Sequence, residues 1–249
     1  MITDSFDNVT KPLISLRDIY GEQKRLADVC IVTFSEVIRS AVLASHACTP
    51  AAEIGTCGGG IPIVTFPHAG RTIAFYLSPI GAAAASQSLL ESNWLTGAEK
   101  FILFGSAGSL APEITANRFV VPSAAYRDEG TSYHYAPPGD YIGLRGSGTV
   151  RDVFASLGVP FAVGKTWTTD AMLRETAGAA AKRRAEGCIT VEMELAGVQA
   201  VCDFHALELY AFLAPGDVLS EDGYSLGTLS DANHNVDKLR LALELAERI

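Results

Sequence analysis

The segment Cys188-Ile189-Thr190-Val191-Glu192-Met193-Glu194 says most about how this chain folds and where its chemistry lies. Its apolar start is typical of a buried strand, and its two carboxylates come where that strand stops. In α/β proteins, polar side chains at strand ends are placed to reach a ligand. A helical pattern begins at the next residue, Leu195, so the segment predicts a strand that leads into a helix beside a binding site.

Apolar runs of strand length alternate with longer helical patterns on both sides of this segment. Several of the runs are apolar throughout, as a sheet covered by helices on both faces requires. We therefore predict one α/β domain over residues 1–249, in three layers, with a central mixed β-sheet flanked by helices. Strands are expected at residues 29–34, 61–66, 72–77, 100–104, 118–125, 159–167, 188–191 and 207–213, and helices at 82–95, 148–157, 174–186, 194–205 and 231–248.

Composition limits the classes of partner. The 249 residues are 48% hydrophobic and 19% charged, enough for one sizeable core, and the net charge is -9. An acidic chain does not favour a nucleic-acid partner or an anionic membrane surface, so a small molecule is the expected ligand. The five cysteines form no CxxC pair, and no apolar run approaches a membrane span. We expect a cytoplasmic protein with no metal site.

The two carboxylates of the opening segment leave two interpretations open. Helical positions two residues apart are turned about 200 degrees from each other, so Glu192 and Glu194 cannot both serve one pocket if both are helical. Acidic residues in a first helical turn are also favoured by the helix dipole and often only cap the helix. The residues alone are therefore consistent with two roles for these carboxylates, capping the helix or binding a ligand.

Two further strand exits carry candidate groups. Gly105-Ser106-Ala107-Gly108-Ser109 follows an apolar run, and glycines in such a turn let backbone N–H groups surround an anion or a sugar hydroxyl. Leu213-Ala214-Pro215-Gly216-Asp217 places an acid after another apolar run. The alternative for the first segment is a tight turn without a ligand. The alternative for Asp217 is an acid that only stabilises a turn or caps a helix.

Three segments resemble the nucleoside phosphorylase family, which includes purine nucleoside phosphorylase and uridine phosphorylase. They are Arg127-Asp128-Glu129-Gly130-Thr131-Ser132-Tyr133-His134-Tyr135-Ala136-Pro137-Pro138, Thr166-Trp167-Thr168-Thr169-Asp170 and Val191-Glu192-Met193-Glu194. The resemblance covers roughly residues 29 to 248. It implies a pentosyltransferase that cleaves the N-glycosidic bond of a ribonucleoside with inorganic phosphate, giving free base and ribose 1-phosphate. It also implies no metal or organic cofactor, and a homo-oligomer between dimer and hexamer.

The resemblance assigns roles to residues of this sequence. It implies that Glu194 accepts hydrogen bonds from the ribose hydroxyls, that Met193 packs on the sugar, and that Asp217 hydrogen-bonds or protonates the leaving base. It places Ser106, Gly108 and Arg39 at the phosphate, and Ala107, Met172, Arg174, Val191 and Glu192 at the base. Glu194 and Asp217 are thus the expected catalytic residues.

Some positions depart from the family pattern. Leu103 stands where many members have a phosphate-binding arginine, and Ser35 stands near Arg39 where a glycine is expected. Glu36 invites comparison with the acid that activates water in nucleoside hydrolases of the same superfamily. A nucleosidase that uses water and a catalytically inactive nucleoside-binding protein are therefore the alternatives. The base is also open, because Asp217 favours a purine whereas residues 127–137 resemble the uridine branch.

Three other residues are given mainly structural interpretations. Arg127 with its acidic neighbours Asp128 and Glu129 is expected to form a salt-bridge cluster that supports the loop. Trp167 is expected in the core or in a pocket wall. His134 is expected at the surface or, by the resemblance, at a subunit contact.

Overall fold

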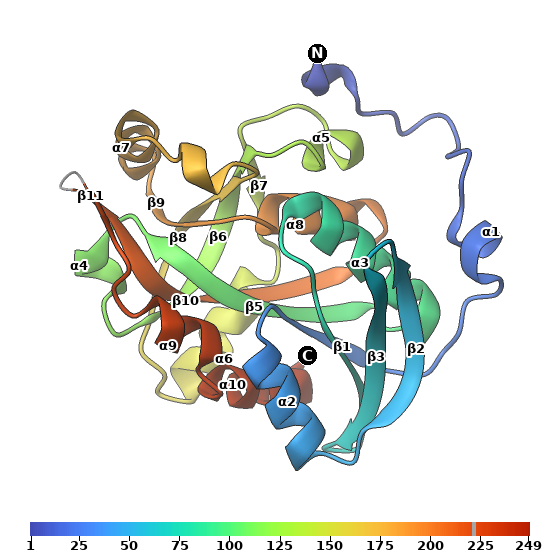
Figure 1. Ribbon diagram of the computed structural model, residues 1–249. Coiled ribbons are helices and arrows are strands. Elements are labelled where there is room, and N and C mark those ends of the chain that lie inside the picture. The colour runs from blue at the N-terminus through green and yellow to red at the C-terminus, as the bar shows by residue number, and fades with distance from the viewer. Residues whose placement is uncertain (221–222) are drawn as a thin grey trace.

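A computed structural model describes residues 1–220 and 223–249 and places helices on both sides of one mixed β-sheet (Figure 1). The predicted α/β fold with a central mixed sheet and flanking helices is confirmed. The described strands are β1 (Val29–Thr33), β2 (Thr49–Thr56), β3 (Gly59–His68), β4 (Arg71–Leu77), β5 (Lys100–Ser109), β6 (Phe119–Asp128), β7 (Tyr141–Gly143), β8 (Phe161–Thr169), β9 (Cys188–Glu192), β10 (Glu208–Ser220) and β11 (Gly223–Ser225).

The helices connect and cover these strands. They are α1 (Leu16–Tyr20), α2 (Glu36–Ser45), α3 (Ala82–Thr96), α4 (Pro112–Thr115), α5 (Ser132–Tyr135), α6 (Ser147–Ser156), α7 (Ala177–Ala185), α8 (Leu195–Phe204), α9 (Leu229–His234) and α10 (Asp237–Arg248), with 3-10 turns η1 (Ile2–Asp4) and η2 (Met172–Arg174). In the part of the chain that the structure describes, no helix is both long and apolar enough to cross a membrane.

The strand order brings the ends of the predicted site strands together. The order is β11-β10-β6-β8-β9-β5-β1-β4-β3-β2, and β7 pairs with β6. Strand β5 is parallel to β1 and β10 but antiparallel to β9, so the last residues of β9 lie beside the second half of β5. Because β10 pairs with both β5 and β6, strands β5, β10, β6, β8 and β9 form a closed circuit of pairings.

Helices pack on both faces of the sheet, which explains the wholly apolar strands. Along β1, Cys30 and Val32 join a core cluster with α3 and α8, whereas Val29 and Ile31 join a cluster with α2, α6 and α10. Successive side chains of a strand point to opposite faces, so a strand covered on both sides needs apolar residues at every position. Full burial of one such side chain is worth about 1.5–3 kcal/mol.

Two strands continue through segments that were expected to be turns. Strand β5 extends through Gly105 to Ser109, because these residues pair with β10 on one side and with β9 on the other. Strand β10 extends past Asp217 to Ser220, with a register irregularity between Pro215 and Val218. The expected turn at 105–109 and the expected strand end before Asp217 are therefore wrong. Pairing partners, which a local pattern does not report, keep both segments extended.

Other element boundaries also differ from the sequence predictions. The helix expected at 174–186 begins only at Ala177, because Thr176 Oγ1 accepts a hydrogen bond from the Ala179 backbone N–H and caps it. The helix expected at 231–248 is divided into α9 and α10. Strand β2 was not predicted, since Thr49–Thr56 carries Pro50, Gly55 and little apolar alternation, and it is formed by pairing with β3.

Candidate active site

Glu192 ends β9 and caps the helix that follows. Its Oε2 accepts hydrogen bonds from the backbone N–H groups of Glu194 and Leu195, both at 2.7 Å, and its Oε1 accepts one from Thr168 Oγ1 at 2.5 Å. These donors include N–H groups that have no partner within α8, so the carboxylate satisfies the helix start. Its predicted contact with the base stays a prediction, and both of its oxygens are engaged within the chain.

Glu194 turns away from Glu192 and toward the beginning of α3. Its Oε1 accepts a 2.8 Å hydrogen bond from the backbone N–H of Gly81, which directly precedes α3, and only 8% of the residue is exposed. The connection joins the carboxyl ends of β9 and β4, which are separated in the sheet by β5 and β1. One carboxylate thus caps a helix while the other spans the strand ends, and Met193 lies half-buried between them.

Both carboxyl groups are harder to ionise than in water. Burial raises the pKa of Glu192 to about 8, and the neighbouring charge of Glu194 contributes to the rise. Burial also raises the pKa of Glu194, against the hydrogen bond from Gly81 that favours its charged form. A carboxyl group with a raised pKa at a strand end is a candidate functional group.

The β5 residues predicted to bind phosphate, Ser106 and Gly108, and the base, Ala107, face different neighbours. Ser106 Oγ donates a 2.5 Å hydrogen bond to Asn233 Oδ1 of α9, whereas Ala107 is buried in the core beside α3 and α8. A Cβ atom on Gly108 would lie 2.9 Å from Val191 Cγ1 and 3.4 Å from Asp217 Oδ2. Glycine is therefore required at Gly108, and its missing side chain lets β9 and β10 approach β5 closely.

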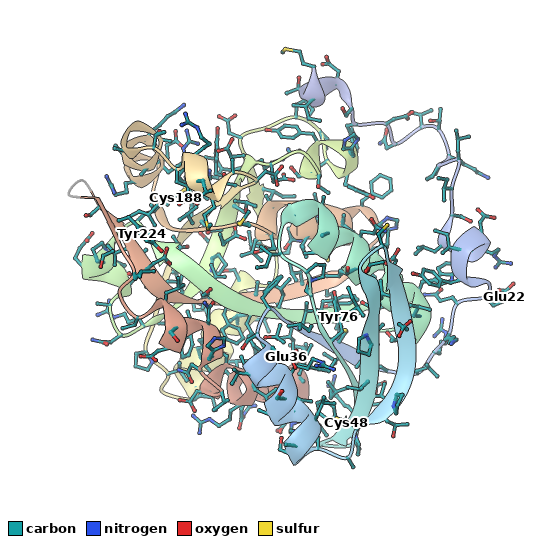
Figure 2. All side chains as sticks on the ribbon, in the orientation of Figure 1. Glu22, Glu36, Cys48, Tyr76, Cys188 and Tyr224 are labelled. Carbon is teal, nitrogen blue, oxygen red and sulfur yellow. The ribbon has the colours of Figure 1, made fainter. Side chains whose placement is uncertain are left out.

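Asp217 lies on the irregular part of β10. It lines a cavity of about 230 Å³ together with residues of β5, α4 and the α9 entry, among them Ser109, Thr115 and Thr228. Burial raises the pKa of its carboxyl, and a hydrogen bond from Tyr224 opposes that rise. Tyr224 lies on β11 (Figure 2). Glu194 is not among the residues lining this cavity. This cavity therefore does not bring the two expected catalytic carboxylates together. Their strands do meet at Gly108, because Asp217 and Val191, which comes three residues before Glu194, both lie close to it.

A second acid lies near Asp217. Glu175 follows η2, and burial together with the negative charge of Asp217 raises its pKa to about 7. Met172 and Arg174 of η2, both predicted to contact the base, are exposed. Their side chains are free to contact a ligand, and their roles stay predictions.

The predicted phosphate arginine is already paired. Glu36 lies on the first turn of α2 (Figure 2), and the guanidinium of Arg39, on the same turn, contacts Glu36 Oε1 at 2.6 Å. Ser40 Oγ donates to the same carboxylate oxygen at 3.3 Å. Leu103, at the other expected arginine position, is only 2% exposed and packs in the core cluster with α3 and α8.

The segment from Arg127 to Glu129 holds the loop around α5, but through different bonds from those expected. Arg127 donates to Ser132 Oγ at 2.8 Å and to the backbone carbonyls of Pro137 and Ala136. The acids point elsewhere, because Asp128 accepts from Trp167 Nε1 at 3.0 Å and Glu129 accepts from the backbone N–H of Ser132. The structural role holds, whereas the expected salt-bridge cluster is wrong.

Four residues enter the site that were given no role in it from the sequence, although Thr168 lies in one of the segments that resemble the family. Gly81 holds Glu194, Thr168 holds Glu192, and α9 supplies Asn233 and His234. His234 Nδ1 lies 3.0 Å from Ser35 Oγ at the start of α2. The only sequence feature that pointed to this contact was Ser35, a serine where the family pattern has a glycine. Asn233 and His234 lie in a helical pattern that contains no recognisable motif.

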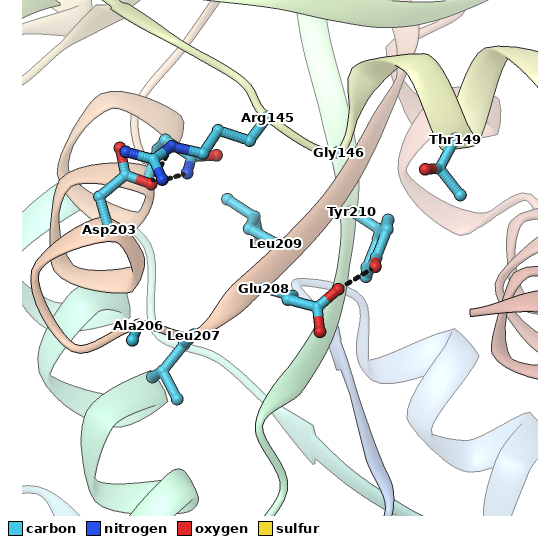
Figure 3. A pocket seen from close by; sticks show the side chains of 10 residues that line it. Arg145, Gly146, Thr149, Asp203, Ala206, Leu207, Glu208, Leu209 and Tyr210 are labelled. Carbon is cyan, nitrogen blue, oxygen red and sulfur yellow. Dashed lines mark hydrogen bonds and ion pairs between the residues drawn. The ribbon is translucent and has the colours of Figure 1, made fainter.

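A larger cavity lies at the opposite end of β10 (Figure 3). Its volume is about 440 Å³, and its lining contains the ion pair of Arg145 with Asp203 at 2.9 Å and the hydrogen bond of Tyr210 to Glu208. None of the predicted site residues lines it. We place the candidate site at the carboxyl ends of β5 and β10, beside Gly108, to which Val191 and Asp217 both lie close.

Comparisons with known proteins agree with this fold. The fold is similar to the crystal structure of Campylobacter jejuni 5'-methylthioadenosine/S-adenosyl homocysteine nucleosidase, with a TM-score of 0.73, 17% sequence identity, and coverage of 90% of this chain and 100% of that one. It is also similar to the native structure of futalosine hydrolase of Helicobacter pylori strain 26695, with a TM-score of 0.72, 14% identity, and coverage of 90% and 99%. A sequence model of the phosphorylase superfamily matches residues 28–249. The chain therefore belongs to the phosphorylase superfamily.

Proposed function

We propose that this protein cleaves the N-glycosidic bond of a nucleoside with water, giving the free base and the free sugar. The observation that carries the choice of water is the state of the two positions where the family resemblance expects phosphate-binding arginines. Leu103 packs in the core, and the Arg39 guanidinium is bound to Glu36. Phosphate is best held by an arginine fork, which Leu103 cannot supply, and the negative charge of Glu36 competes with phosphate for Arg39, so these positions favour a neutral nucleophile.

Glu194 is suited to the sugar side of the reaction. Breaking the bond builds positive charge on the ribose, and a carboxylate placed beforehand stabilises that charge without having to reorganise. The hydrogen bond from Gly81 leaves Oε2 of Glu194 with only the backbone N–H of Met193, at 3.3 Å. We assign Oε2 to the ribose hydroxyls, with Met193 packing on the sugar.

Asp217 is suited to the base side. The departing base takes the electron pair of the glycosidic bond and needs a proton, and burial keeps that proton on Asp217 at a higher pH than in water. Glu175 beside it, with a pKa near 7, can return the proton. Exposed Met172 and Arg174 are assigned to the base itself.

Glu36 is the candidate base for water. Its carboxylate lies at the start of α2, directly after the carboxyl end of β1. In the proposed step the water oxygen bonds to the anomeric carbon, the glycosidic bond breaks, and its electron pair goes to the base nitrogen. The proton of water goes to Glu36, and the base receives one from Asp217, so solvent exchange restores both acids.

Phosphorolysis, which the sequence resemblance implies, is the second candidate. It is favoured by membership of the phosphorylase superfamily and by the phosphate role that the family resemblance implies for Ser106 and Gly108, which both lie on β5. The third candidate is a protein that binds a nucleoside without cleaving it. The core position of Leu103, where the family pattern has a phosphate-binding arginine, is compatible with this candidate.

A panel of purine and pyrimidine nucleosides, each incubated with and without phosphate, tests all three. Chromatography reads the freed base, and a sugar assay separates ribose from ribose 1-phosphate. We expect equal base release in both buffers, with ribose as the second product. Release that depends on phosphate and yields ribose 1-phosphate would establish phosphorolysis. Calorimetric binding of nucleosides with no base released would establish the binding protein.

A further inference from the structure

Helix α9 lies across the strand ends of the candidate site. In Figure 1 it sits beside β10 and next to the start of α2. It is packed tightly on Gly216, the residue before Asp217, because a Cβ atom there would lie 2.7 Å from both Ala232 Cβ and Leu229 Cα. The Thr228 backbone N–H also donates to the Gly216 carbonyl at 2.8 Å. The helix is therefore held in place at the β10 irregularity that carries Asp217.

The last turn of α9 contacts two serine hydroxyls, one on β5 and one at the start of α2. Asn233 Oδ1 accepts the proton of Ser106 Oγ at 2.5 Å. His234 Nδ1 lies 3.0 Å from Ser35 Oγ, and that oxygen also accepts the Ile38 backbone N–H at 3.3 Å to cap α2. A hydroxyl has one proton to donate, so Ser106 has none left for a phosphate oxygen.

Lys238 fixes this turn from beneath. Its side chain is only 1% exposed, and its Nζ donates to the backbone carbonyls of Ala232 and Asn233. These are carbonyls at the end of α9 that lack partners within the helix. A buried ammonium group there holds Asn233 and His234 against the two serines rather than leaving them on a loose surface turn.

We propose that Asn233 and His234 are specificity-determining residues that select water over phosphate. Asn233 Oδ1 takes the one proton that Ser106 could donate to an anion, and His234 Nδ1 is hydrogen-bonded to Ser35 Oγ, so both hydroxyls are already engaged within the chain. The adjacent carboxylate of Glu36 neutralises Arg39 and so cancels the attraction that this arginine would otherwise exert on an anion. Water, small and neutral, can donate to an oxygen acceptor and is not excluded. The inference rests on the proposed nucleoside cleavage.

The test compares the full-length wild type with the double variant Asn233→Ala/His234→Ala. Isothermal titration with inorganic phosphate alone measures anion binding, and the sugar assay measures the ratio of ribose 1-phosphate to ribose. Freeing both hydroxyls should tighten phosphate binding about tenfold, as hydrogen bonds to a charged group predict. Ribose 1-phosphate should then form in the double variant and not in the wild type.

The control is Ser230→Ala, at an exposed position of the same helix, which should leave both readouts at the wild-type values. Phosphate binding by the wild type that is lost in the double variant would overturn the inference, because the pair would then be phosphate ligands. Unchanged phosphate binding in a folded double variant would overturn it equally. If the wild type releases no base from any nucleoside, the proposed function fails, while the phosphate titration still decides whether the pair excludes the anion.

Discussion

The backbone N–H of Gly81 donates a 2.8 Å hydrogen bond to the carboxylate of Glu194, 113 residues further along the chain. The bond connects the turn before α3 with the turn before α8, and so ties the carboxyl ends of β4 and β9 together. Because a buried carboxylate needs hydrogen-bond partners, this contact holds Glu194 at the strand ends without consuming its second oxygen.

Glu194→Gln should reduce base release about a hundredfold while the protein stays folded. The glutamine carbonyl can still accept the Gly81 N–H, but the amide carries no negative charge to stabilise the ribose cation. Steady-state kinetics with the best nucleoside of the panel measures the loss, and thermal unfolding checks the fold. A folded variant with unchanged kcat would contradict the assignment of Glu194 to the sugar.

Asp217→Asn should lower base release about a hundredfold, because an amide cannot protonate the leaving base. The loss should be much smaller for nitrophenyl riboside, whose leaving group departs without a proton. The matched control is Asp152→Asn, at an exposed position of α6 remote in sequence from the site strands. Equal losses for nucleosides and nitrophenyl riboside would show that Asp217 is not the leaving-group acid.

Glu192→Gln should change the dependence of stability on pH. The pKa of Glu192 is raised from 4.5 to about 8, so between these values the folded state holds a proton that the unfolded state releases. The free energy of unfolding of the wild type therefore falls as pH rises through this window. Urea unfolding at several pH values should show a shallower fall for Glu192→Gln than for the exposed control Glu113→Gln. Identical slopes would mean that Glu192 is ionised normally.

Lys238→Met should change the dependence of stability on pH in the opposite direction to Glu192→Gln. Burial lowers the pKa of Lys238 from 10.5 to about 8, so between these values the unfolded state holds a proton that the folded state lacks. The Lys238 contribution to the free energy of unfolding thus rises with pH across this window, and the variant should lose that rise. The exposed Lys182→Met serves as the control in the same urea titrations. A variant curve parallel to the wild-type curve would show that Lys238 is not titrating there.

Gly108→Ala should cost about 1–3 kcal/mol of stability, because the added methyl overpacks the contact of three strands. Its Cβ would lie 2.7 Å from Leu219 Cδ1 and 2.9 Å from Val191 Cγ1. Gly178→Ala is the control, since nothing lies within 4 Å of its Cβ and alanine favours the helix there. Denaturant unfolding compares the two, and a neutral Gly108→Ala would show that the strands can separate freely.

The family segments and the strand and helix patterns could be read from the sequence because they depend on neighbours along the chain. The largely apolar runs 29–34 and 100–104 indicated a sheet covered on both faces, and the alternation of runs indicated an α/β fold. The carboxylates at Glu192 and Glu194 were found for the same reason, because a strand end followed by a helix start is a local signal.

The sequence by itself determined the fold class, the family and the strand ends at which chemistry is expected. Tertiary structure alone decided that Glu192 caps α8 while Glu194 reaches Gly81, and that β5 and β10 continue through their glycines. It also brought Asn233 to Ser106 and His234 to Ser35, across 127 and 199 residues of chain. Periodicity reports which face of an element is buried, whereas these contacts depend on which distant elements become neighbours, and a local pattern carries no information about that choice.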